Sequence, residues 1–88
     1  MSEDTRRPHK APDVDVHEVV DGFVVYHPSR NRVHYLNHTA AIVLELCTGE
    51  NDAPEIVHQL QATFELSEPP TTEIEECLTQ LYAEGLIC

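Results

Sequence analysis

The sequence of 88 residues has no tryptophan, and it has only five lysine and arginine residues against sixteen aspartate and glutamate residues. The last basic residue is Arg32, whereas acidic residues continue as far as Glu84. Proteins that bind nucleic acids or anionic membranes use clustered Lys and Arg side chains to displace counterions from phosphate groups. The formal net charge of -11 therefore argues against nucleic acids and membrane surfaces as partners.

Long apolar runs and paired cysteines are also missing. No run approaches the roughly 18 residues that a transmembrane helix needs, and no apolar signal-peptide core follows Met1. The cysteines, Cys47, Cys77 and Cys88, are odd in number and contain no CxxC pair, which argues against a disulfide framework and a zinc ribbon. These absences predict a small cytoplasmic protein.

The residues that could support catalysis are not arranged for it. The three glycines lie too far apart to form a phosphate-binding loop. His34 and His38 have a metal-ligand spacing, but they fall on either side of an expected switch from strand to helix at Asn37. No Cys or Ser is placed as an activated nucleophile. We therefore expect no metal, no cofactor and no enzymatic activity.

The chain divides into a short tail and one domain. Residues 1–12 are polar and contain two prolines, which predicts a disordered tail, and residues 13–88 form the predicted domain. Apolar residues over 14–20 and 23–26 flank Asp21-Gly22, a two-residue hairpin signal. After a turn over 28–31, residues 32–36 form a third strand. The pattern predicts a three-stranded meander.

The apolar period then becomes helical, and each of the three expected helices begins at a capping residue: Asn37, Asp52 with Glu55, and Thr71 or Thr72. The helices are expected to end near Cys47, Phe64 and Gly85. Their predicted buried faces are Ile42, Val43, Leu46 and Cys47, then Ile56, Val57, Leu60 and Phe64, then Ile74, Cys77, Leu78, Leu81 and Tyr82. The predicted fold class is α+β: a winged helix-turn-helix-like domain with a three-stranded antiparallel sheet followed by three helices.

The outer strands of such a sheet leave unpaired backbone groups, and an edge strand of this kind can accept a peptide. The strand over residues 32–36 has no Pro or Lys that would block such pairing. Leu36 is expected in the core, and Tyr35, on the opposite face, is the better candidate for contact.

The run over residues 33–49, VHYLNHTAAIVLELCTG, resembles the central signature of the PqqD family. That signature has a hydrophobic strand, Leu-Asn, a helix that starts with small residues, and Leu-Cys-Asp-Gly at the helix end. Thr48 stands here where the family often has Asp. The apolar positions of the later helices also match, so that the resemblance spans about residues 14–88.

This resemblance implies a RiPP recognition element, a domain that binds the leader region of a ribosomally made precursor peptide. Such a domain presents the peptide to a tailoring enzyme, often a radical S-adenosylmethionine (SAM) protein, and founding members serve pyrroloquinoline quinone synthesis. The leader adds as a strand beside the third strand, in a groove against the third helix. The positions that the resemblance assigns to peptide binding are Arg32, Val33, His34 and Tyr35 on the strand, and Glu75, Leu78 and Tyr82 on the helix.

Three other functions remain open at this point. A winged-helix transcriptional regulator would need a basic recognition helix, yet residues 71–84 carry only acidic charges. A small metal or redox carrier would rest on the His and Cys content alone. A self-associating module, a homodimer, would use the same open strand edge. The acidic balance favours a leader peptide that contains Lys or Arg.

Overall fold

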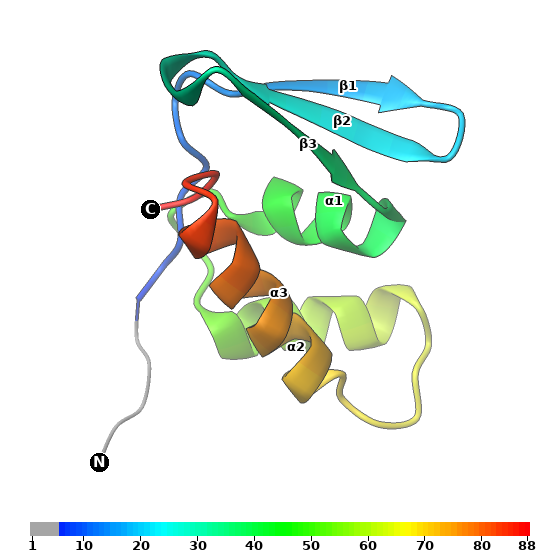
Figure 1. Ribbon diagram of the computed structural model, residues 1–88. Coiled ribbons are helices and arrows are strands. Elements are labelled where there is room, and N and C mark those ends of the chain that lie inside the picture. The colour runs from blue at the N-terminus through cyan, green and yellow to red at the C-terminus, as the bar shows by residue number, and fades with distance from the viewer. Residues whose placement is uncertain (1–5) are drawn as a thin grey trace.

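The computed structural model describes residues 6–88 (Figure 1). Three antiparallel strands in the order β1-β2-β3 precede three α-helices, which confirms the predicted α+β class. The elements are β1 (Asp15–Val19), β2 (Gly22–His27), β3 (Arg32–Leu36), α1 (His38–Leu46), α2 (Ala53–Thr63) and α3 (Thr71–Ala83). The likeness to a winged helix-turn-helix stays a prediction.

The first hairpin turns one residue earlier than expected. Val19 pairs with Gly22, so Val20 and Asp21 form the turn, and Gly22 already belongs to β2. A Cβ atom on Gly22 would lie 2.5 Å from the carbonyl oxygen of Leu36 in β3. The glycine is therefore explained by the close approach of a neighbouring strand, not by the turn itself.

The connection between β2 and β3 follows the expected turn chemistry. A 3-10 turn spans Pro28–Arg30, and the proline fixes the first φ angle of that turn. Asn31 then adopts a left-handed conformation with φ 52°, and its N–H donates to the Pro28 carbonyl oxygen at 3.0 Å. This local geometry reverses the chain and sets β3 beside β2.

The first two helices begin where the capping residues predicted. The Asn37 side chain accepts a hydrogen bond from the Ala40 N–H at 2.8 Å. Asp52 accepts from the Glu55 N–H at 2.9 Å, and the Glu55 side chain accepts from the Asp52 N–H at 2.8 Å. Both ends therefore satisfy backbone donors that have no partner inside the helix.

The start of α3 differs from the prediction. Its N-cap is Pro70, without a side-chain capping bond, and the Pro70 carbonyl oxygen accepts from the Ile74 N–H at 3.0 Å. Thr71 and Thr72 consequently lie inside the first turn. The restricted φ of proline is compatible with a helix that starts immediately after it, so a threonine cap is not needed here.

The helices cover one face of the sheet. In Figure 1, α1 lies directly against this face, α2 lies on the far side of α1 from the sheet, and the C-terminal end of α3 rises toward the sheet. Contacts of α1 with β2, β3 and α3 bury a wide arc of this helix rather than a single stripe. Leu44, which was not among the predicted core residues, is only 1% exposed for this reason. The most deeply buried side chains are Val25, Val43, Leu44, Ile56, Leu60, Ile74, Leu81 and Leu86.

Phe64 is a wrong core prediction, because its side chain is 44% exposed. The helix that was expected to carry it, α2, ends at Thr63. The Phe64 N–H still donates to the Leu60 carbonyl oxygen at 3.0 Å, and Phe64 lines an open surface hollow with Leu60 and Ile74, which leaves its ring partly in solvent.

Residues 8–11, within the expected tail, form backbone hydrogen bonds with distant parts of the chain. His9 exchanges backbone hydrogen bonds with Cys88 at 2.9 and 2.8 Å, and the Ala11 N–H donates to the Leu86 carbonyl oxygen at 2.9 Å. Figure 1 shows this segment beside the C-terminus. Backbone pairing needs no apolar periodicity, so the side-chain pattern gave no sign of it. Residues 1–5 of the expected tail lie outside the described residues.

Among residues 6–88, no helix combines the length and the apolar character that crossing a membrane requires.

Leu44→Ala is expected to lower the free energy of unfolding by about 2 to 5 kcal/mol, since it leaves a cavity in the core. Leu46→Ala is the matched control, because it makes the same exchange at a half-buried position of the same helix. The control should cost clearly less. Urea denaturation followed by circular dichroism measures both variants, and equal losses would contradict the central position of Leu44.

Ala11→Asp should destabilise the protein by about 2 kcal/mol, because it places a charge at a position that is only 9% exposed. Ala62→Asp, at an exposed position in the last turn of α2, serves as the control and should lose about 1 kcal/mol, from helix propensity and from the negative end of the helix dipole. Thermal unfolding measures both. If the two variants melt alike, the segment over residues 8–11 does not pack against the C-terminus in solution.

Candidate functional site

β3 lies at an edge of the sheet, with one side paired to β2 and the other side open. Its side chains alternate between the two faces. Val33 and Tyr35 lie on the outer face and are 65% and 58% exposed, while His34 is half-buried and Leu36 is buried toward the helices. The open side of β3 therefore has backbone N–H and C=O groups that no strand pairs. Exposed apolar side chains flank these groups on one face of the sheet, and His34 flanks them on the face toward the helices.

Tyr35 is fastened to the first hairpin. Its hydroxyl group donates a hydrogen bond to the Asp21 carbonyl oxygen. The hydroxyl oxygen would lie 2.7 Å from a Cβ atom on Gly22, so the absence of a side chain there leaves room for the phenol. Tyr35 thus ties the end of β3 to the first hairpin, while the residue stays 58% exposed.

A cavity of about 260 Å³ lies between β3 and α3. Residues from the end of β3, the start of α1 and the second half of α3 line it: Tyr35, Leu36, Asn37, Ala40, Cys77, Gln80, Leu81 and Glu84. Leu36 and Leu81 are buried and apolar, whereas Gln80 and Glu84 bring polar groups. We call this cavity, together with the open edge of β3, the β3–α3 groove.

Glu84 links the helix to the strand across this groove. Its Oε1 atom lies 3.4 Å from Nδ1 of His34, and its Oε2 atom accepts a hydrogen bond from the Gln80 side-chain amide at 2.8 Å. The side chains of His34 and Glu84 are 11% and 27% exposed. The carboxylate is therefore positioned from both sides while part of its surface stays open.

A second histidine holds the same end of α3. Nε2 of His27, in β2, donates a hydrogen bond to the Gly85 carbonyl oxygen at 3.1 Å. A carbonyl oxygen can only accept, so the ring nitrogen must carry the proton. Gly85 has φ 75°, and a Cβ atom there would meet the Arg30 guanidinium at 2.7 Å. Two contacts thus fix the distance between the sheet and the C-terminal end of α3.

The structure separates the predicted site residues into two groups. Arg32, Val33, His34 and Tyr35 all lie on the open edge strand, as expected. Glu75, Leu78 and Tyr82 line a different cavity, of about 90 Å³, together with Arg6, Pro8, Ala53 and Thr79. In that cavity the Arg6 guanidinium carbon lies 4.8 Å from the centre of the Tyr82 ring. The structure does not bring these three helix positions to the edge of β3.

The helix residues that do face β3 are Cys77, Gln80 and Glu84, and the sequence reading did not select them. Their spacing of three and four residues places them on one face of α3. That face could have been found by testing each flank of the apolar stripe. Which flank lies next to β3, however, depends on how α3 packs on α1 and α2.

Burial controls the chemistry of two cysteines near the groove. Cys47 is 2% exposed, and burial, with a smaller effect from Cys77, raises the pKa of its thiol to about 12. Burial, followed by the nearby Glu84 charge, also raises the pKa of the half-buried Cys77 thiol. Both groups are therefore held as neutral thiols, which makes them poor nucleophiles.

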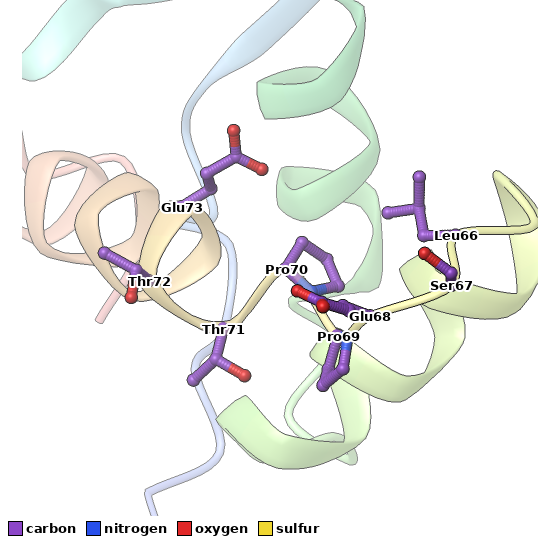
Figure 2. A pocket seen from close by; sticks show the side chains of 8 residues that line it. All are labelled: Leu66, Ser67, Glu68, Pro69, Pro70, Thr71, Thr72 and Glu73. Atoms are coloured by element: carbon purple, nitrogen blue, oxygen red, sulfur yellow. The ribbon is translucent and has the colours of Figure 1, made fainter.

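Other surface hollows do not gather comparable groups. Figure 2 shows a hollow of about 410 Å³ whose lining residues, 66–73, all come from the α2–α3 loop and the first turn of α3. A neighbouring apolar hollow of about 400 Å³ includes Phe64, Leu66 and Ile74. Within residues 6–88, no group of three or more His, Cys, Asp or Glu side chains could hold a metal ion.

Alkylation of the native protein at about pH 8 should follow the order Cys88, then Cys77, then Cys47. The first is exposed, while the raised pKa values of the other two reduce the fraction of reactive thiolate. Mass spectrometry after iodoacetamide treatment gives the three rates, and the urea-unfolded chain is the control in which they converge. Rapid native labelling of Cys47 would contradict its position in the core.

Comparison with known proteins bears on the same region. Residues 22–87 match the family described as coenzyme PQQ synthesis protein D (PqqD). The match begins at the first residue of β2 and includes β3, all three helices and the β3–α3 groove. No curated protein and no solved structure matches the chain. The family match covers most of the sequence, and the chain therefore belongs to the PqqD family.

Proposed function

We propose that this protein binds the leader region of a ribosomally made precursor peptide along β3 and presents it to a tailoring enzyme. The observation that carries the proposal is the open edge of β3 beside a groove against α3, inside the region that matches the PqqD family. The product is coenzyme PQQ or another peptide-derived compound, and the enzyme is of the radical SAM type. The protein itself acts as a peptide chaperone and not as an enzyme.

The physical basis of binding is strand addition. An extended peptide beside β3 satisfies the backbone donors and acceptors that β2 does not reach. These main-chain bonds supply affinity for many sequences, whereas the groove selects side chains. The Val33 and Tyr35 side chains on the outer face add apolar cross-strand contacts.

We propose Arg32, Val33, His34 and Tyr35 as the strand side of the site. On the helix side, the geometry supports Cys77, Gln80 and Glu84, which line the same cavity as the end of β3. These replace Glu75, Leu78 and Tyr82, whose cavity is lined instead by the N-terminal segment and α2.

The charge distribution favours a peptide over DNA. Residues 38–83, which include all three helices, contain no Lys or Arg. A recognition helix without cations cannot neutralise phosphates, on which non-specific DNA affinity depends. A regulator that binds DNA through these helices is accordingly the weaker proposal.

Self-association through β3 is a second proposal, supported by the two exposed apolar side chains on this edge. In an antiparallel pair centred on His34, Val33 of one copy would lie opposite Tyr35 of the other, a favourable cross-strand combination. The peptide and the second copy would compete for the same backbone groups. Sedimentation at increasing protein concentration, with and without peptide, detects such competition.

Hydrogen exchange tests strand addition directly. With a saturating leader peptide encoded beside the gene, alternate amides of Arg32–Leu36 should exchange at least about tenfold more slowly, because the added strand accepts their hydrogen bonds. The amides of Asp15–Val19, on the other edge strand, are the internal control and should not change. Nitrogen-proton NMR spectra resolve both strands.

A second peptide controls for binding elsewhere. N-methylation at alternate residues removes half of the peptide donors, and in one of the two alternating registers it should abolish binding. Binding that is unaffected in both registers, or protection on β1 instead of β3, would overturn the proposal.

A further inference from the structure

We infer that the peptide bound along β3 carries a Lys or Arg side chain that pairs with Glu84, two residues away from an apolar side chain that fills the cavity beside Leu36. The inference rests on the proposed strand addition, and it adds the sequence pattern that this particular groove selects. Four observations carry it: the position of Glu84, its free acceptor capacity, its charge environment and the alternation of a strand.

Glu84 stands where an added strand must pass. It lies at the C-cap of α3, lines the cavity with Leu36, and approaches His34 of the edge strand at 3.4 Å. Alternation places Arg32, His34 and Leu36 on the helix-facing side of β3, where Arg32 is exposed, His34 is half-buried and Leu36 is buried. A peptide side chain opposite His34 on this face therefore comes next to the Glu84 carboxylate.

The carboxylate keeps capacity for another donor. A carboxylate has about four acceptor sites. Its partners in the described part of the chain are His34 and the Gln80 amide, and its side chain is 27% exposed. These contacts fix its orientation without enclosing it, so a cationic donor can approach from the open edge.

The charge environment favours a cation at this position. No basic residue lies in the last turn of α3, where the helix dipole already places negative partial charge. Two cations lie in this region: Arg30 packs against Gly85, the next residue, and Arg32 lies on the same face of β3 as His34. Neither forms an ion pair with Glu84 in the described part of the chain, where the carboxylate is paired with His34. The Glu84 charge also acts on another residue of the groove: burial is the larger cause of the raised pKa of Cys77, and the negative charge of Glu84 is the smaller one. The groove thus presents negative potential that the chain itself balances only in part.

Strand alternation converts these positions into a sequence pattern. Residues i and i+2 of an extended peptide point to the same face. If one of them lies opposite His34, the other lies opposite Leu36, over the cavity of about 260 Å³. The apolar Leu36, Ala40 and Leu81 side chains there suit one aliphatic or aromatic side chain. The selected pattern is basic-x-apolar or its reverse, according to the direction of the peptide.

Selection from random nine-residue peptides displayed to the immobilised full-length protein tests this pattern. The wild type should enrich Lys or Arg two positions from an aliphatic or aromatic residue. Glu84→Lys should replace the basic residue by Asp or Glu and keep the apolar one. Glu75→Lys is the matched control, since it makes the same exchange on the same helix but lines the other cavity, and it should select as the wild type does.

The outcomes separate this inference from the proposed function. Enriched peptides without the basic residue, or an equal switch in Glu75→Lys, would overturn the Glu84 pairing and leave strand addition in place. Failure to enrich any peptide would overturn both.

Affinity measurements give the size of the effect. Replacing the basic residue of a selected peptide by norleucine, or Glu84 by Gln, should each weaken binding roughly 5- to 20-fold. The two changes together should weaken binding hardly more than either one alone, because they remove the same pair. Glu75→Gln is again the control. Independent, additive losses would contradict a direct contact between Glu84 and the peptide.

Discussion

The attachment of the C-terminal end of α3 to the sheet is the contact on which the candidate site depends. His27 donates to the Gly85 carbonyl oxygen, and His34 approaches the Glu84 carboxylate, so two neighbouring strands hold two neighbouring residues. These contacts set the separation between β3 and α3 and therefore the width of the groove. Since β3 has no strand on its other side, the groove stays open along the edge that a peptide would use.

The structure also offers a basis for selectivity in the proposed peptide binding. Backbone groups of an edge strand bind extended chains with little regard to sequence, so selection must come from the side chains beside the strand. Here these are an apolar cavity and one oriented carboxylate. Under the proposed function, such a site would select the peptide and leave the chemistry to a partner, which fits membership in the PqqD family.

Local elements were the most predictable part of the fold. Asn37, the Asp52 and Glu55 pair, and the turn over Pro28–Asn31 act through hydrogen bonds and dihedral preferences within a few residues, and all occur as expected. The misplaced features have longer-range causes. Gly22 is required by the close approach of β3, and residues 8–11 pair with the opposite end of the chain. The role of neither could therefore be predicted from adjacent residues in the sequence.

The sequence by itself determined the order of strands and helices and the edge position of residues 32–36, because apolar period and helix capping are local properties. It also provided the family resemblance that the match over residues 22–87 confirmed. Only the tertiary structure decided which side of α3 faces the strand. Cys77, Gln80 and Glu84 lie there, while Glu75, Leu78 and Tyr82 turn to the N-terminal segment and α2. The sequence of an amphipathic helix specifies which stripe of side chains is buried. Which of the two polar sides of that stripe lies next to β3 is decided by how α3 packs against α1 and α2.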